Sequence, residues 1–254
     1  MAGDKDVEAG QFAEIPEDFE LPRRNSPREE PQIYLSEELI AIYTAFREQV
    51  HNPQSVLYPS CGFDASPARI FDNVTFVDIE DGNERCVAKL QEAGLQALKQ
   101  DIRTYRPQEL HDLLILLNPA IPTEWASRHL QPGGYVISNN YHGNASEMHR
   151  QPDQFTLWGV INFAEKDRRK GDNQVVVSRN VEDLFQPVAN EEELQRFRPE
   201  YYDFLQMLFP SFALNMPDFS AEGPFEEVWA NYREMMREGM PSKRVADRYI
   251  FVKK

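Results

Sequence analysis

The chain has 254 residues, of which 41% are hydrophobic and 11% aromatic, so it can bury a sizeable core and is not a disordered protein. Its 42 acidic and 27 basic residues give a formal net charge of −15, which disfavours nucleic acids and anionic membranes as partners. The two cysteines are too few for a disulfide framework or a zinc site, and they predict a reducing, cytoplasmic location. The sequence has no export signal and no apolar run of membrane-spanning length, so we expect a soluble protein.

The first predicted elements are a flexible arm and a helix. Residues 1–33 are rich in charge and proline and poor in large apolar side chains, so we expect a flexible acidic arm. Ser36 precedes two glutamates, and Leu39, Ile42 and Phe46 follow at helical spacing, which predicts a capped amphipathic helix. Residues 34–254 are then expected to form one domain.

Short apolar runs alternate with helical or turn segments from residue 55, a pattern typical of a parallel sheet covered on both faces. Five strands are predicted at residues 55–58, 74–78, 95–98, 113–117 and 135–138. Between them we expect a helix capped by Asn83 and stopped by Gly94, a short helix from Thr123 through Leu130, and a turn at residues 132–134. The fold class is therefore α/β, doubly wound and mostly parallel.

The pattern changes after residue 150. Further strands are predicted at residues 155–161, 175–177 and 248–252, with a mostly helical insertion over about residues 165–245 before the last strand. An apolar stripe at residues 225–236 indicates a core helix or a subunit interface, or else a lid over the substrate pocket, and a subunit interface implies a homo-oligomer formed through the insertion. The basic run at residues 166–170 is predicted to be a solvated turn rather than a nucleic-acid contact.

Polar and glycine residues directly follow the predicted parallel strands, where ligands bind in open α/β sheets. Gly62 follows the first strand and lets the backbone approach a ligand closely. Asp78 ends the second strand, where its carboxylate can accept the hydroxyl hydrogens of a ribose, and Asp101 follows the third, where it could meet an adenine amino group. Asn118 follows the fourth strand. Together these residues predict one crevice for a nucleotide-like cofactor.

This set of residues resembles the class I S-adenosylmethionine-dependent methyltransferases over roughly residues 54–164 and 248–254. The similar segments are residues 56–62 as the glycine loop, 77–79 as the ribose-binding acid, Asp101 as the adenine contact, 112–119 as strand four and 130–135 before strand five. The resemblance implies a Rossmann-like, seven-stranded sheet with one antiparallel strand, here the C-terminal one, and S-adenosyl-L-methionine as cofactor. The cofactor-binding residues that it implies are Tyr58, Ser60, Gly62, Asp64, Asp78, Asp101 and Asn118.

The glycine loop departs from the family pattern, because Ser60 and Asp64 stand where glycine is common. Asp64 could form a salt bridge with the ammonium group of the cofactor or repel its carboxylate. Residues 118–121 lack the second proline and the aromatic residue found in amino-methylating enzymes, so that chemistry is not carried over. A catalytically inactive methyltransferase-like interaction module is therefore the main alternative to an active enzyme.

The substrate and the remaining chemistry are only broadly predicted. A single loop glycine favours a methyl donor over a nicotinamide dinucleotide, whose pyrophosphate needs a richer glycine loop. We expect a small-molecule or protein acceptor, with Asn118, Tyr141 and His142 as candidate catalytic residues near it. The spacing of His142, Glu147 and His149 fits no helical metal pair, so no metal is predicted. Cys61 is interpreted as a small packed residue rather than a nucleophile.

Overall fold

The computed structural model divides the chain into two units, residues 1–31 and residues 32–254. It describes residues 32–80, 85–117, 119, 121–164, 174–186, 188, 191–197 and 242–254, all within the second unit. The predicted acidic arm therefore lies almost wholly outside the described residues. The same holds for the basic run at residues 166–170 and the apolar stripe at residues 225–236.

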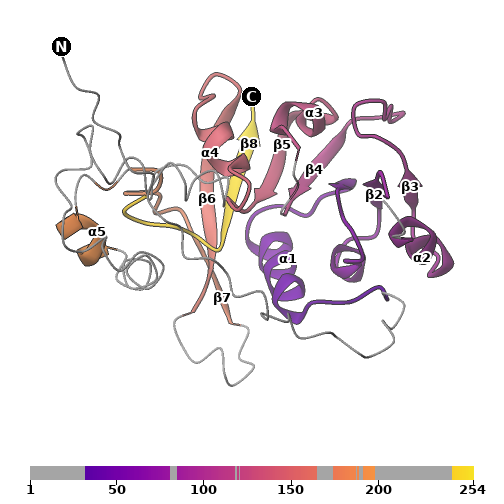
Figure 1. The fold of residues 1–254 in the computed structure, drawn as a ribbon, viewed down its shortest axis with the longest axis horizontal. Helices are drawn as coiled ribbons and strands as arrows, with labels where there is room; N and C mark the ends of the chain where they lie inside the picture. The colour runs from indigo at the N-terminus through magenta and orange to yellow at the C-terminus, as the bar shows by residue number, and fades with distance from the viewer. Residues whose placement is uncertain are drawn as a thin grey trace, which may run out of the picture. The chain divides into compact units, whose positions relative to one another are not determined.

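The described strands form one eight-stranded sheet in the order β3-β2-β1-β4-β5-β8-β6-β7 (Figure 1). Strands β1 to β5 are parallel, and β8 is antiparallel to both β5 and β6. The antiparallel direction of the C-terminal strand β8 agrees with what the family resemblance implies. The strand bounds are β1 (Val56–Pro59), β2 (Val74–Asp78), β3 (Ala97–Lys99), β4 (His111–Leu116), β5 (Leu130–Ser138), β6 (Phe155–Phe163), β7 (Val175–Ser178) and β8 (Arg248–Lys253).

The resemblance implied seven strands with one antiparallel, whereas the described sheet has eight with two antiparallel, β7 and β8, and contains all eight strands predicted from the residues. Strand β7 pairs antiparallel with β6, from Val160 opposite Ser178 to Phe163 opposite Val175, and forms an extra edge strand. The described part of the predicted insertion consists of β7 and the helix α5 (Glu191–Phe197). Because residues 198–241 lie outside the described residues, a mostly helical insertion stays a prediction.

Helices cover both faces of the sheet, which confirms the doubly wound arrangement. The other helices are α1 (Glu37–Gln49), the 3-10 helix η1 (Ser66–Arg69), α2 (Cys86–Glu92), α3 (Thr123–Ser127) and α4 (Asn144–His149). Helices α1 and α2 contribute Phe46 and Leu90 to one core cluster, and α4 contributes Met148 to the other. On β4, Ile115 belongs to the first cluster and Leu114 to the second, as expected for a strand buried on both faces.

Local sequence signals explain several element boundaries. The Ser36 hydroxyl accepts a hydrogen bond from the Leu39 N–H at 3.3 Å and caps α1 as predicted. Gly94 has a φ of +80° and ends α2 in the predicted left-handed conformation. Asn83, the expected cap of α2, lies outside the described residues, and Arg85 precedes the helix without a side-chain capping bond.

The fifth strand begins earlier than predicted. Strand β5 starts at Leu130, opposite His111, and the next paired residues are Leu113 and Tyr135. The predicted turn at residues 132–134 is therefore an irregularity within β5, and α3 ends before Leu130. Residues 131–134, which include two glycines, bulge out of the strand. Leu130 before them and Tyr135 after them can therefore both pair with β4.

A histidine pair is buried where β4 and β5 begin. His111 is 6% exposed, its Nε2 lies 3.0 Å from the Tyr105 hydroxyl, and its Nδ1 is buried without a hydrogen-bond partner. Burial, reinforced by His129 nearby, lowers the pKa of His111 to about 4. Burial also lowers the pKa of His129. Both imidazoles are therefore held neutral in the folded chain.

This pair predicts acid-sensitive stability. A histidine whose pKa is depressed by folding contributes stability above its ordinary pKa of about 6.5, and that contribution is lost as the pH falls towards about 4. Between pH 7 and pH 4 the unfolding free energy of the unmodified chain should fall. We expect it to fall by about 2 kcal/mol less in the variant His111→Gln, which keeps a neutral hydrogen-bonding group. Urea unfolding at several pH values measures this difference. Parallel pH profiles for the two proteins would contradict the assignment.

Candidate functional site

The loop after β1 lies at the carboxyl end of the parallel strands. The Ser60 N–H donates to the Val77 carbonyl of β2 at 2.8 Å, which ties the loop to the neighbouring strand. Ser60 and Gly62 both have a φ of +53°. Ser60 thus adopts a conformation that favours glycine, even though its side chain departs from the family pattern. A Cβ atom built on Gly62 would meet no atom within 4 Å, so the space beside this glycine is open.

Asp78 ends β2 and points towards this loop. Its Oδ2 accepts a hydrogen bond from the Gly62 N–H at 3.0 Å, and its Oδ1 accepts one from the Glu80 N–H at 3.0 Å. A carboxylate has about four acceptor positions, so each oxygen can accept a further hydrogen bond. The structure therefore places Gly62 and Asp78 side by side, as the ends of the predicted strands led us to expect.

The two residues that follow Asp78, Ile79 and Glu80, belong to the same edge, and the sequence pattern predicted no role for either side chain. Ile79 is 58% exposed, which is unusual for a large apolar side chain at the end of a buried strand. Glu80 has a φ of +50°, and its carboxylate binds Lys99 at 3.1 Å and the Ala88 N–H at 3.2 Å. Glu80 thereby joins β2, β3 and the first turn of α2. Ile79 is left as an apolar surface beside the Asp78 carboxylate.

Asp64 and Tyr58 face the protein interior instead of the open side of the loop. Asp64 is 1% exposed and accepts hydrogen bonds from the Tyr58 hydroxyl at 3.1 Å, the Ser66 N–H at 2.9 Å and the Ser66 hydroxyl. Burial raises the pKa of Asp64, and the bonds from Ser66 and Tyr58 oppose that rise. We therefore assign Asp64 and Tyr58 to support of the loop, although the resemblance implied that both contact the cofactor.

Cys61, the remaining polarisable side chain of the loop, is 4% exposed. Burial, followed by the nearby Asp78 carboxylate, raises the pKa of its thiol well above the ordinary value. A thiol held neutral in this way is a poor nucleophile at neutral pH, which agrees with its interpretation as a packed residue.

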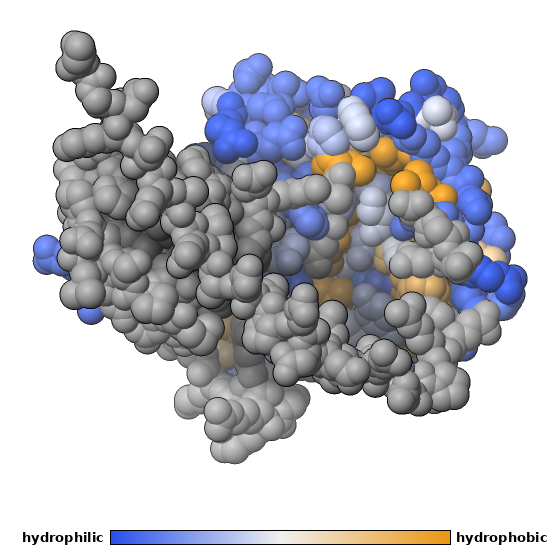
Figure 2. Space-filling model, viewed as in Figure 1, coloured by the Kyte–Doolittle hydropathy of each residue, from blue (hydrophilic) through white to orange (hydrophobic). Residues whose placement is uncertain are grey.

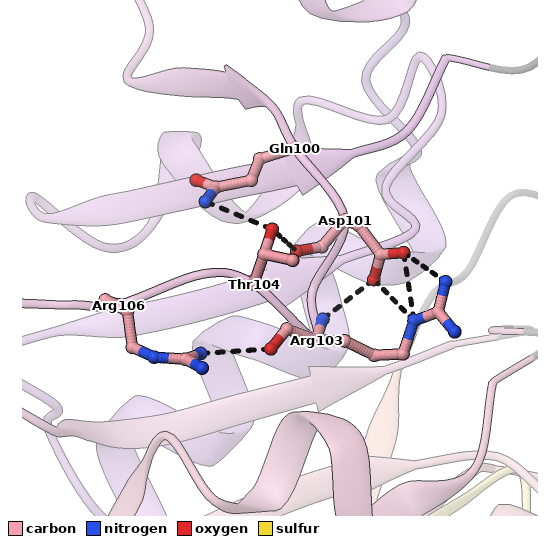
Figure 3. A network of polar contacts seen from close by, with 5 residues as sticks. All are labelled: Gln100, Asp101, Arg103, Thr104 and Arg106. Carbon is pink, nitrogen blue, oxygen red and sulfur yellow. Dashed lines mark hydrogen bonds and ion pairs between the residues drawn. The ribbon is translucent and has the colours of Figure 1, made fainter.

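Asp101 follows β3 and is engaged by Arg103 (Figure 3). Its carboxylate accepts hydrogen bonds from the Arg103 backbone N–H at 2.8 Å and from Nε at 3.0 Å, and Arg103 lowers its pKa. The Arg103 guanidinium lies 4.8 Å from the ring centroid of Trp125, on α3. An adenine amino group would have to share Asp101 with this arginine, so its role as an adenine contact stays a prediction.

The candidate catalytic residues lie after β4 and β5. Asn118 lies outside the described residues. Tyr141 is 48% exposed, and its ring meets that of His142 edge to face at 4.8 Å. Asn140, just before them, binds both the backbone N–H and the hydroxyl of Ser146 at 2.8 Å and holds the start of α4. Tyr141 and His142 therefore form a pair at the carboxyl end of β5, two strands away from Gly62.

His149, considered with His142 as a metal ligand, stacks on Phe185 at 4.4 Å. No three His, Cys, Asp or Glu side chains within the described ranges are grouped to hold a metal ion. None of the helices in those ranges combines the length and the apolar character that a membrane crossing demands.

Two surface hollows lie at the other end of the sheet. The first, of about 350 Å³, is lined by residues that precede β1 and β2, including Arg47, Gln54 and Asp72. The second, of about 320 Å³, shares Asp72 with it and reaches Gln96, before β3. Both lie at the amino ends of the strands, opposite Gly62 and Asp78. On the face drawn in Figure 2, apolar side chains gather within an otherwise hydrophilic surface.

Comparisons with known proteins give structural matches only. No family model matches the sequence, and neither does any curated protein. The chain is similar to the N-methyltransferase NodS from Bradyrhizobium japonicum WM9 in complex with S-adenosyl-L-homocysteine, at 13% identity and a TM-score of 0.39 over 55% of this chain and 82% of that one. It is also similar to a putative O-methyltransferase from Klebsiella pneumoniae, at 13% identity and a TM-score of 0.39 over 54% and 78% of the two chains. A third similar structure is the sugar N-methyltransferase KedS8 from Streptoalloteichus sp ATCC 53650, at 17% identity and a TM-score of 0.33 over 55% and 58%.

Proposed function

We propose that this chain binds S-adenosyl-L-methionine at Gly62 and Asp78 and transfers its methyl group to a small-molecule or protein acceptor. The observation that carries the proposal is the contact between the Asp78 carboxylate and the Gly62 N–H at the tips of two adjacent parallel strands. The sheet order reverses beside them, because β2 and β4 lie on opposite sides of β1. Such a reversal is where open α/β sheets bind ligands.

The chemistry of this edge suits a nucleoside. The free acceptor positions of Asp78 can take the two hydroxyl hydrogens of a ribose, and the open side of Gly62 lets the ligand approach the backbone. The exposed side chain of Ile79 offers an apolar surface for the flat face of a base. These groups present no cluster of backbone N–H donors to a pyrophosphate, which favours a phosphate-free cofactor.

Methyl transfer depends mainly on the alignment of the acceptor atom with the methyl group. The bound cofactor supplies a methyl group activated by a sulfonium centre. The protein has to hold the acceptor atom in line with that methyl group and exclude water. If the acceptor atom is a nitrogen or oxygen that carries a proton, a base has to remove this proton. We propose Tyr141 and His142 for that step because they follow β5 on the same edge of the sheet.

A second function is favoured by the hydrogen bonds that already engage the edge. The Gly62 N–H and both Asp78 oxygens are used within the protein, and Asp64 is buried. An edge satisfied in this way is stable without a ligand, as expected of an inactive methyltransferase-like interaction module. In that case residues 1–33 and the insertion at about residues 165–245 are the proposed contact surfaces, and a homo-oligomer through the insertion is one outcome.

Titration calorimetry distinguishes these functions. We expect S-adenosylhomocysteine and S-adenosylmethionine to bind with one site per chain, and NAD to give no heat of binding. Binding of NAD alone would contradict the methyl donor and support a nicotinamide-dependent oxidoreductase. No heat with any of the three ligands would overturn the enzyme proposal and leave the interaction module.

A further inference from the structure

Several buried side-chain atoms of the described residues have no hydrogen-bond partner, and two of them belong to α1 and β8. One is the hydroxyl of Tyr43, a fully buried side chain of α1. The other is Nε of Arg248, the first residue of β8. A buried donor left unpaired costs about 1–3 kcal/mol, and more when it is charged. A single bound group, or ordered water, can satisfy two such groups when they lie close together.

The two groups lie on the same face of the sheet. Arg248 and Ile250 are two residues apart on β8, so their side chains point to the same face of the sheet. Ile250 belongs to the same core cluster as Tyr43. The electrostatics agree with this placement: burial raises the pKa of Tyr43, Asp64 raises it further, and Arg248 lowers it. Tyr43 is therefore within electrostatic range of Asp64, which follows β1, and of Arg248 on β8.

Arg248 is at the end of the sheet that carries the proposed site. Tyr249 pairs with Ser138, the last residue of β5, and Arg248 precedes it on an antiparallel strand. Arg248 is therefore level with the carboxyl ends of the parallel strands. The core cluster that contains Tyr43 also includes Leu117, which follows β4, and Ile137 of β5, and these two strands lie between β1 and β8 in the sheet order.

The free edge of Arg248 fits a carboxylate. Its Nη1 donates to the Asp247 carbonyl, which leaves the edge formed by Nε and Nη2. In the described part of the chain, Arg248 forms no ion pair. A half-buried guanidinium without a counter-charge favours an anion, and two parallel N–H groups match the two oxygens of a carboxylate. The Tyr43 hydroxyl can supply a third donor.

The position of Arg248 distinguishes the acceptor from the cofactor. Neighbouring strands lie about 4.8 Å apart, so β8 is roughly 14 Å from the strand before Gly62 and roughly 19 Å from the strand that ends in Asp78. A cofactor whose ribose is at Asp78 and whose backbone contact is at Gly62 leaves the tips of β4, β5 and β8 for its reaction partner.

We propose that Arg248 and Tyr43 form a subsite for the carboxylate of the methyl acceptor. The acceptor is then a small carboxylic acid, held by its anionic end so that its reacting atom lies over β4 and β5. This assignment of the acceptor rests on the proposed methyl transfer, whereas binding of a carboxylate at this subsite does not.

Arginine side-chain NMR on the full chain tests the subsite, with sodium acetate as the probe. We expect the Nε–H resonance of Arg248 to shift in a saturable way as acetate is added. Tyr43→Phe should weaken acetate binding about tenfold, because one hydrogen bond to a charged group is lost. Arg244→Gln, a change at a half-buried arginine that binds the Asn180 and Glu182 carbonyls, is the control and should leave the shift intact.

Several results would overturn the proposal. A shift that does not saturate, or that is equal at Arg244 and Arg248, would indicate non-specific ion binding. Saturation by inorganic phosphate but not by acetate would contradict a carboxylate. Displacement of acetate by S-adenosylhomocysteine would assign the subsite to the cofactor instead of the acceptor.

Calorimetry separates failure of the subsite from failure of the proposed function. Arg248→Gln should bind S-adenosylhomocysteine as tightly as the unmodified chain does, while it loses the acetate response. If the unmodified chain binds acetate but no S-adenosylhomocysteine, the methyltransferase proposal fails and the carboxylate subsite stands. If it binds S-adenosylhomocysteine but not acetate, the subsite is wrong.

Discussion

Replacing Asp78 with asparagine is expected to weaken the binding of S-adenosylhomocysteine by about 10- to 100-fold. The carboxylate accepts both ribose hydroxyl hydrogens in our account, and a hydrogen bond to a charged group contributes about 1.5–3 kcal/mol. Asparagine keeps the shape but has one acceptor oxygen, and its amide hydrogens oppose the N–H groups of Gly62 and Glu80. Titration calorimetry measures the change in affinity.

The control is Asp72→Asn, at an exposed carboxylate before β2. It removes the same charge at the opposite end of the strand, so we expect unchanged affinity. Asp78 also binds the Gly62 N–H and so holds the loop after β1. Thermal unfolding of both variants therefore accompanies the titration, to separate a loss of stability from a loss of ligand binding. Equal affinities for Asp78→Asn and the unmodified chain would remove the ribose role of this residue.

Gly159→Ala is expected to lower the free energy of unfolding by about 2–3 kcal/mol. Gly159 follows a register shift in the pairing of β6 with β8, and a Cβ atom there would lie 2.5 Å from the Ser178 carbonyl oxygen of β7. Because that atom belongs to the backbone, β7 would have to move away from β6. Urea unfolding measures the loss.

A matched control is Gly133→Ala, where an added Cβ atom meets nothing within 4 Å and only the φ of +81° opposes the change. This strain costs roughly 1–2 kcal/mol. A loss at Gly159 that is no larger than the loss at Gly133 would show that β7 does not approach β6 this closely.

Much of the fold could be predicted because its signals are local. The five apolar runs, the Ser36 cap and the Gly94 stop each occupy a few consecutive residues, and the structure contains each of these elements. The residue pattern predicted all eight strands, whereas the family resemblance implied seven. Residues 175–177 carry a strand pattern, but whether such a run pairs with β6 depends on contacts that are distant along the chain.

The candidate site was predictable where it depends on strand ends. Parallel strands bring their carboxyl ends to one edge, and this places Gly62 beside Asp78. Asp64 could not be placed, because its burial depends on how the Tyr58 and Ser66 side chains turn inward. The partner of Asp101 had a local signal, since an arginine two residues later can fold back onto an aspartate.

Two further features of the candidate site had a weak signal in the sequence or none. Ile79 follows the aspartate that ends β2, and only its exposure in the folded chain shows that it belongs to the edge. The positive φ of Ser60 is a property of the folded loop, and the presence of a serine does not predict it.

A crystal structure of the chain with S-adenosylhomocysteine would show whether Asp78 and Gly62 hold the cofactor. We expect the ribose hydroxyls within hydrogen-bond distance of the Asp78 carboxylate and the ligand chain passing the open side of Gly62. Crystals grown at saturating ligand that show it elsewhere, or that show Asp78 bound only to the Gly62 and Glu80 N–H groups, would contradict the account.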